Sequence, residues 1–268
     1  MSKTSEKRPA DATPPHAVHF VGAGPGDPEL ITVKGQRLLR EADLVIFTGS
    51  LVPRTLLAGL KAKIHDSAGM NLDEVIALVI QAWREGKRIV RLHTGDPSIY
   101  GAINEQISLL REQDIPFIVV PGVSSGTASA AALQTELTLP EVSQTVIFTR
   151  RGGRTPVPEG EKLSSLATHQ ATMMIFLSVS MIDEVVTDLL AGGYPLDTPV
   201  AIVEKVSWPE EKQLRGTLAT IAGQVKEAKI CKTAIIAVGK VLADGPPPAL
   251  SKLYDSAFTH GFRQGSGG

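Results

Sequence analysis

Three short segments of this sequence combine glycine with proline, aspartate, serine or threonine, in types and spacing suited to holding a ligand. They span residues 22–27, 94–97 and 121–125. Glycine lets a backbone approach a bound molecule closely, because no side chain intervenes. Aspartate, serine and threonine supply oxygen atoms that accept hydrogen bonds. Our starting hypothesis is that the three segments form one binding site.

The first segment, Gly-Ala-Gly-Pro-Gly-Asp, is similar to a dinucleotide-binding turn but departs from that pattern in three ways. Asp27 stands where the third glycine belongs, and its carboxylate would repel a pyrophosphate. Pro25 removes one N–H group from the loop that would contact phosphate. Asp43 precedes the second expected strand, whereas a ribose-binding acid should follow that strand. The sequence therefore disfavours a dinucleotide site.

Each of the three segments directly follows an apolar run that is typical of a buried strand. These runs, together with a fourth without such a segment, span residues 18–21, 88–92, 117–120 and 44–47. We expect helices ending near Glu41, covering residues 72–83 behind a cap at Asn71, and beginning at Pro97. Alternating strands and helices predict an α/β fold with mostly parallel strands, whose carboxyl ends bind ligands.

After residue 140 the pattern changes, and a hairpin becomes plausible. We expect two helices, at 181–190 and 218–226, and strands at 145–149, 172–177, 199–206, 213–217 and 234–238. The neighbouring runs at 199–206 and 213–217 indicate a mixed sheet. The predicted organisation is a disordered tail (1–16), an N-terminal α/β domain (17–140), a C-terminal α/β domain (141–243) and a flexible tail (244–268).

Composition excludes several classes of function. The net charge of −1 gives no global field for nucleic acid or anionic membranes. No apolar stretch reaches the length of a membrane span, and the polar first sixteen residues lack a signal-peptide core, so we expect a cytoplasmic protein. The single cysteine, Cys231, excludes an intrachain disulfide, and we expect it to be buried. The six histidines lack ligand-like spacing, so we expect no metal site.

The three segments, in their order and spacing, resemble the signature of the tetrapyrrole (corrin/porphyrin) methylases. The resemblance begins with Val-Gly-Ala-Gly-Pro-Gly-Asp-Pro-Glu-Leu-Ile-Thr and covers residues 18–241. Within the family, several segments are similar to the methyltransferases that modify carbon 11 of precorrin-4 or cobalt-precorrin-4. These segments include Thr-Gly-Asp-Pro-Ser-Ile-Tyr-Gly, Glu-Leu-Thr-Leu-Pro-Glu and Gln-Thr-Val-Ile-Phe-Thr-Arg.

The resemblance implies a methyltransferase of cobalamin biosynthesis with the class III fold, two α/β domains with S-adenosylmethionine bound between them, and a homodimer. S-adenosylhomocysteine would be the product. By motif position, the residues implied in donor binding are Pro25, Thr94, Gly95, Asp96, Ile99, Ser124, Ser125, Leu177, Ser178, Val206, Thr233 and Ala234. The carboxylate of Asp96 would accept hydrogen bonds and offset the positive sulfonium, although it could serve only as a helix cap.

The tetrapyrrole substrate would carry many carboxylate arms, for which this near-neutral chain needs a local basic cluster. Arg150, Arg151 and Arg154 form such a cluster, with an exposed charged loop as the alternative, and Arg91 and Lys205 are weaker candidates. His93 is a weak catalytic candidate, because a lone histidine at a strand end is more often structural. Some relatives carry an aspartate after the second strand, but residues 47–50 contain no acid here.

Two other functions remain open from the sequence. One is a sibling methylase that acts at another ring position, for example on uroporphyrinogen III. The other is a tetrapyrrole-binding protein without activity.

Overall fold

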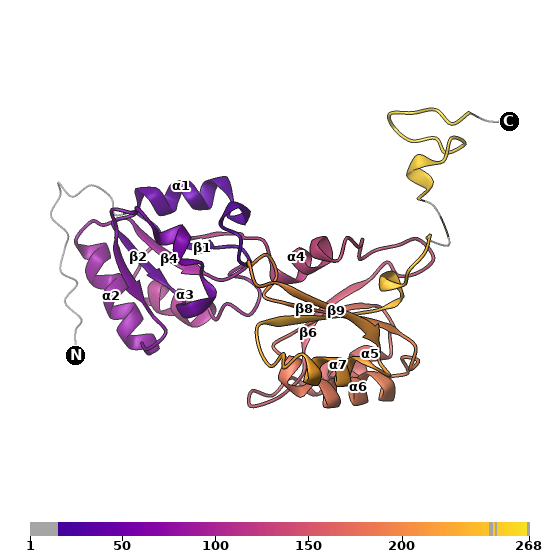
Figure 1. The fold of residues 1–268 in the computed structure, drawn as a ribbon. Helices are drawn as coiled ribbons and strands as arrows, with labels where there is room; N and C mark the ends of the chain where they lie inside the picture. Colours follow the sequence, from indigo (N-terminus) through magenta and orange to yellow (C-terminus); the bar gives the residue numbers. More distant parts are fainter. Residues whose placement is uncertain (1–15, 247–248, 250, 267–268) are drawn as a thin grey trace. The chain divides into compact units, whose positions relative to one another are not determined.

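The computed structural model describes residues 16–246, 249 and 251–266, and these form two compact units (Figure 1). The first unit ends at Ser124 and the second begins at Ser125. This division precedes an alanine-rich helix, α4 (Ser125–Ala132), whereas we predicted a domain boundary near residue 140. Most of the predicted N-terminal tail lies outside the described residues.

A parallel five-stranded sheet forms the centre of the first unit, as predicted. Its order is β3-β2-β4-β1-β5, and the strands are β1 (Val18–Gly22), β2 (Leu44–Phe47), β3 (Lys63–Asp66), β4 (Ile89–His93) and β5 (Phe117–Val120). The pairing places the carboxyl ends of β2, β4, β1 and β5 along one edge. The glycine-rich segments leave the sheet at this edge.

Helices cover both faces of the first sheet (Figure 1). The helix α1 (Val33–Glu41) packs on one face, and α2 (Leu72–Arg84) and α3 (Asn104–Glu112) pack on the other. Successive side chains of a strand point to opposite faces. Val45 of β2 accordingly joins the core beneath α1, whereas Ile46 joins the core beneath α2 and α3. Both faces are apolar, which is why these strands read as continuous apolar runs.

The helix ends of the first unit follow from a few local contacts. Asn71 caps α2 by accepting from the amide of Glu74, whose carboxylate accepts in return from the amide of Asn71. The expected helix start at Pro97 is wrong, because α3 begins at Asn104. Residues 97–100 form a turn, and the positive φ angles of Tyr100 (54°) and Ala102 (48°) are incompatible with a helix.

A mixed five-stranded sheet forms the second unit, again as predicted. Its order is β6-β7-β10-β8-β9, and the strands are β6 (Val146–Arg150), β7 (Thr172–Phe176), β8 (Pro199–Glu204), β9 (Lys212–Thr217) and β10 (Ala234–Val238). Only β6 and β7 pair in parallel. The expected hairpin is confirmed as the antiparallel pair of β8 and β9.

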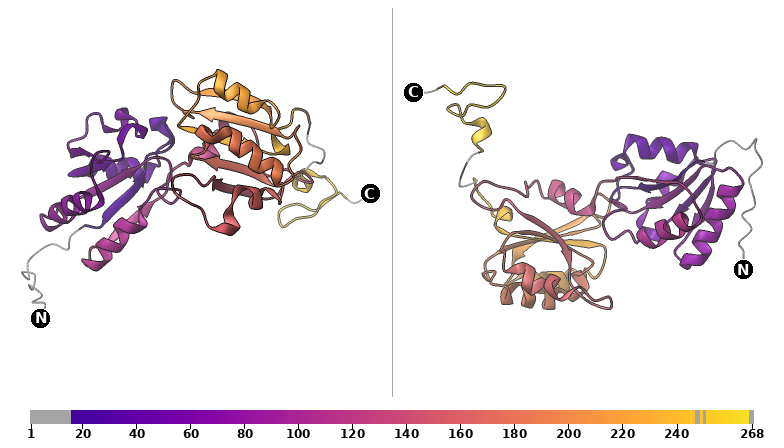
Figure 2. Two further views of the ribbon diagram at one scale, coloured as in Figure 1. Left: turned by 90° about the horizontal axis from the view of Figure 1, so that it is seen from below. Right: turned by 180° about the vertical axis from the view of Figure 1, so that it is seen from behind.

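The second sheet also has helices on both faces (Figures 1 and 2). The helices α5 (Leu163–Ala167), α6 (Ile182–Ala191) and α7 (Ile221–Glu227) cover one face over an apolar core. The helix α4 lies on the other face, where Gln213 and Arg215 of β9 donate to the carbonyls of Ala132 and Leu133 at its end. These bonds satisfy carbonyl groups that a helix end leaves unpaired.

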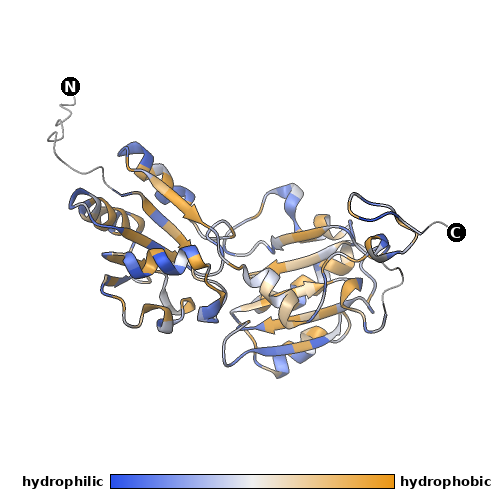
Figure 3. Cartoon of the chain, turned by 90° about the horizontal axis from the view of Figure 1, so that it is seen from above, coloured by the Kyte–Doolittle hydropathy of each residue, from blue (hydrophilic) through white to orange (hydrophobic). Residues whose placement is uncertain are grey.

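Figure 3 shows the apolar strands of both sheets in orange and the hydrophilic outer positions of the helices in blue. Cys231 departs from its expected burial, since it is exposed in the loop before β10. Within the described residues, no helix is both long and apolar enough to cross a membrane. Residues 251–266 carry a short 3-10 helix at Lys252–Tyr254, and the flexibility predicted from residue 244 onward stays a prediction.

Candidate functional site

The three glycine-rich segments of the first unit meet at the carboxyl edge of its sheet, as predicted. The amide of Ala23 donates to the carbonyl of His93 (2.7 Å), and that of Gly95 donates to the carbonyl of Gly24 (2.8 Å). The amide of Gly122 donates to the carboxylate of Asp96 (2.9 Å). These bonds join the first segment to the second and the second to the third.

Close contact between the three backbones explains why glycine stands at these positions. A Cβ atom at Gly122 would lie 2.2 Å from the carbonyl oxygen of Gly95, and one at Gly22 would lie 2.6 Å from the Cα atom of Gly122. Gly24 and Gly95 also have positive φ angles of 79° and 62°. Any larger residue would force the segments apart, so the glycines are needed for their convergence.

Asp96 uses both carboxylate oxygens on backbone amides. Oδ1 accepts from the amide of Ser98 (2.7 Å), and Oδ2 accepts from that of Gly122 (2.9 Å). No helix begins at Asp96, so it does not act as the helix cap that the sequence left open. Its negative charge instead lies where the second and third segments are joined.

The other first-unit residues expected at the donor site lie on the same three segments or next to them. Pro25 is buried in the first segment, and Ile99 is half-buried in the turn after the second. The hydroxyl of Thr94 is buried without a hydrogen-bond partner among the residues that the structure describes. Ser124 ends the first unit, and Ser125 begins α4 in the second.

In the second unit, the residues expected at the donor site gather at one edge of the mixed sheet. Leu177 and Ser178 follow β7, Val206 lies just after β8, and Thr233 directly precedes β10. Ala234 begins β10 opposite Glu204. The sheet therefore brings these residues, which are far apart in the sequence, to neighbouring strand ends.

This edge of the second sheet carries backbone strain. Leu177, Lys205, Ser207 and Thr233 have positive φ angles between 48° and 64°, which L-residues adopt at a cost. The amide of Lys205 donates to the carbonyl of Thr233 (2.8 Å). Strain of this kind concentrates at functional sites. The sequence analysis named Lys205 only as a weaker candidate for substrate binding and did not single out Ser207, because a positive φ angle leaves no signal in residues of these types.

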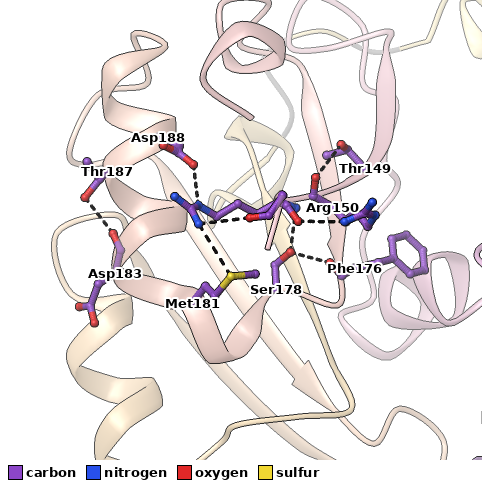
Figure 4. Close-up of polar contacts among 10 residues, drawn as sticks. Thr149, Arg150, Phe176, Ser178, Met181, Asp183, Thr187 and Asp188 are labelled. Atoms are coloured by element: carbon purple, nitrogen blue, oxygen red, sulfur yellow. Dashed lines mark hydrogen bonds and ion pairs between the residues drawn. The ribbon is translucent and has the colours of Figure 1, made fainter. Parts of the chain in front are cut away.

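Arg150 and Arg151, at the same edge, are engaged within the second unit (Figure 4). Arg150 donates to the carbonyls of Thr155 (2.9 Å) and Pro156 (2.8 Å). Arg151 forms an ion pair with Asp188 of α6 (2.7 Å). Arg154 is exposed, and no bond or ion pair of its side chain is found in the described part of the chain. Their role in substrate binding stays a prediction.

His93 and Arg91 point to the face of the first sheet that α3 covers. Burial, and then the nearby charge of Arg91, lower the pKa of His93 to about 3. Its ring lies 5.9 Å from that of Phe20, an environment that favours a packing role. Burial lowers the pKa of Arg91 to about 10, and its guanidinium donates to Gln106 and to the carbonyl of Ile46.

The sequence of this chain matches one family model and is similar to several known enzymes. Residues 17–222 match the family model described as Tetrapyrrole (Corrin/Porphyrin) Methylases. A cobalt-precorrin-4 C(11)-methyltransferase of Methanocaldococcus jannaschii is 57% identical over 249 residues, which cover 92% of this chain and 96% of the relative. A precorrin-4 C(11)-methyltransferase of Pseudomonas aeruginosa is 49% identical over 249 residues. The match covers 92% of this chain and 99% of the relative.

Solved structures of methyltransferases are also similar to this chain. The X-ray structure of a cobalt precorrin-4 methyltransferase matches with a TM-score of 0.84 and 46% identity, over 85% of this chain and 96% of that one. A uroporphyrin-III C-methyl transferase from Thermus thermophilus, in complex with S-adenosyl homocysteine, matches with a TM-score of 0.71 and 29% identity, over 85% and 99%.

Proposed function

The chain belongs to the tetrapyrrole (corrin/porphyrin) methylases, and on this premise we propose that it transfers a methyl group from S-adenosylmethionine to carbon 11 of precorrin-4 or cobalt-precorrin-4. The observation that carries the proposal is the 57% identity to a cobalt-precorrin-4 C(11)-methyltransferase over 92% of the chain. Methylation of uroporphyrinogen, the sibling activity, has weaker support, since the matched enzyme with that name is 29% identical. The reaction would belong to cobalamin biosynthesis.

The residues of the glycine-rich segments fit the methyl donor. S-adenosylmethionine supplies an electrophilic methyl group on a positively charged sulfur, beside an adenosine and an amino acid that need hydrogen-bond partners. The segments bring together backbone groups that are free of side chains, the carboxylate of Asp96 and the buried hydroxyl of Thr94, which has no hydrogen-bond partner in the described part of the chain. These groups are polar and carry one negative charge, which suits a cationic, hydrogen-bonding ligand.

The chain's own contribution to the reaction is mainly positioning. Methyl transfer requires an in-line approach of the substrate carbon, and a rigid arrangement lowers the entropic barrier to that approach. Asp96 would hold two segments together through its amide contacts, and its charge would offset the sulfonium. We assign no general base, because residues 47–50 contain no acid and burial lowers the pKa of His93 to about 3, which makes its imidazole a weak base.

A titration with S-adenosylhomocysteine tests the donor site, with NAD as the control. We expect saturable heat release with S-adenosylhomocysteine alone, and at least tenfold weaker binding by Asp96→Ala, which leaves the amides of Ser98 and Gly122 without their acceptor. Binding of NAD alone would overturn the proposal and restore the dinucleotide interpretation of residues 22–27.

Turnover with a labelled methyl donor distinguishes the remaining functions. Incorporation of label at carbon 11 supports the proposal, and incorporation at another ring position would identify a sibling methylase. Label that stays in the donor, despite tetrapyrrole binding, would identify a binding protein without activity. Comparing precorrin-4 with cobalt-precorrin-4 in the same assay determines which form is the substrate.

A further inference from the structure

We propose that Arg154 is a side chain of the second unit that binds a carboxylate arm of the substrate, and that Arg150 and Arg151 are positioning residues that hold the loop presenting it. The proposal rests on the proposed function, because that function supplies the acidic tetrapyrrole whose carboxylate Arg154 would bind. It divides three neighbouring arginines, which look equivalent in the sequence, into two with internal contacts and one whose side chain has none with the described residues.

Arg150 holds the loop that follows β6. Its Nη1 donates to the carbonyl of Thr155 (2.9 Å), and its Nη2 donates to the carbonyl of Pro156 (2.8 Å). The amide of Gly153 also donates to the carbonyl of Thr155 (3.2 Å). These contacts turn residues 151–156 back toward the strand end. The loop is arranged around the guanidinium of Arg150. Because two of its donors bond carbonyls inside the loop, Arg150 is poorly placed to bind a substrate.

Arg151 ties the same loop to α6 and to the end of β7 (Figure 4). Its Nε donates to the carboxylate of Asp188 (2.7 Å), and its Nη1 contacts the sulfur of Met181 (3.8 Å). Its amide donates to the hydroxyl of the buried Ser178 (2.9 Å), which donates in turn to the carbonyl of Phe176 (2.7 Å). The charge of Arg151 is thus compensated, and the loop is fixed to the strand end that carries Leu177.

Arg154 differs from both neighbours. It lies between the anchored ends of the loop, its side chain is exposed, and none of the described residues pairs with its charge. The loop leaves the sheet beside the end of β7, since Arg150 pairs with Phe176 in the parallel register. Leu177, 69% exposed and with a φ angle of 54°, follows directly. A guanidinium that pairs with none of the residues described, on a fixed loop that leaves the sheet beside a strained strand end, is well suited to a carboxylate.

The first test compares steady-state kinetics of the full-length wild type and Arg154→Gln with the tetrapyrrole varied. We expect the KM to rise about tenfold and kcat to stay within twofold, because a contact made equally in ground and transition states affects KM alone. Affinity for S-adenosylhomocysteine should not change. Arg154→Lys should recover part of the loss, since it keeps the charge but not the two-pronged geometry.

Lys240→Gln is the matched control. Lys240 is exposed and lies after β10, at the opposite edge of the same sheet, so this variant removes the same charge away from the loop. We expect wild-type KM. A second probe is uroporphyrin, a stable tetrapyrrole with eight carboxylates, compared with its octamethyl ester. Arg154→Gln should weaken binding of the acid about tenfold and leave binding of the neutral ester unchanged.

A double-mutant cycle tests the positioning role of Arg151. Arg151→Met should raise the KM several-fold in the wild-type background but have little further effect in Arg154→Gln, because its action would pass through Arg154. Additive effects would contradict this part of the proposal. If Arg154→Gln has wild-type KM while the enzyme still methylates carbon 11, this inference fails and the proposed function stands. Absence of both donor binding and turnover would instead refute the proposed function.

Discussion

His93 shows how burial sets the chemistry of a single residue. Its imidazole is buried against Phe20, its Nε2 lacks a partner among the described residues, and its pKa falls from 6.5 to about 3. Desolvation disfavours the charged form, and the guanidinium of Arg91 adds repulsion. The neutral ring therefore packs well at pH 7, whereas the unfolded chain binds a proton near pH 6.5.

This shift predicts a pH dependence of stability. Because the folded pKa is lowered, the contribution of His93 is fully present above pH 6.5 and is lost as the pH falls toward 3. Between pH 7.5 and 5.5 the wild type should lose about 1 kcal/mol of unfolding free energy from this group, and His93→Gln should lack that loss. Urea unfolding of both proteins at the two pH values measures this change in unfolding free energy. An equal change in wild type and His93→Gln would contradict the lowered pKa of His93.

The arginine cluster marks the limit of residue-level prediction. Its location past the end of a strand and its charge were visible in the sequence, whereas the carbonyl partners of Arg150 and the pairing of Arg151 with Asp188 were not. Asp188 lies far along the chain on α6, and only the fold of the second unit brings it to the loop. Which arginine remains unpaired is therefore a property of the three-dimensional structure.

At the scale of elements, strands buried on both faces were predicted well, since a short continuous apolar run between turn residues is typical of such a strand. The strand β3 was missed because Lys63, His65 and Asp66 give it a polar character suited to a sheet edge. The start of α3 was misplaced because Tyr100 and Ala102 adopt positive φ angles, which residues of these types do not signal in the sequence. Element ends were less predictable than element interiors for the same reason.

The junction of the three glycine-rich segments yields a prediction at this scale. Gly122→Ala places a methyl group against the carbonyl of Gly95, so we expect a loss of about 1–3 kcal/mol in unfolding free energy. Affinity for S-adenosylhomocysteine should fall at least tenfold as the segments separate. Gly69→Ala is the control, because its new methyl group would meet no atom within 4 Å. Calorimetric titration of both variants with S-adenosylhomocysteine measures this affinity. Unchanged affinity in Gly122→Ala would show that donor binding does not depend on the junction.

At the scale of the whole molecule, we predict a homodimer, as the family resemblance implies. The edge strand β5 exposes Ile118 (41%), and an apolar side chain on a free sheet edge is the kind of surface that proteins tend to cover. Sedimentation equilibrium should therefore yield twice the chain mass of 28.4 kDa at micromolar concentration. A mass of one chain across that range would contradict the prediction.

The position of β1 has a consequence for how the chain folds during synthesis. Both partners of β1 follow it in the sequence, because β1 lies between β4 and β5, and they are complete only once residues 89–93 and 117–120, respectively, have been made. Such non-local pairing is slow, because the entropy of closing a long loop is lost before any stabilising contact forms. The apolar residues of β1 must therefore stay unpaired until β4, the third further strand, has been translated, and their second partner follows only with β5. The hairpin of β8 and β9, by contrast, can pair as soon as its short connection emerges. We infer that the sheet of the first unit forms only after most of that unit has been translated, whereas the β8–β9 hairpin can form soon after its own synthesis.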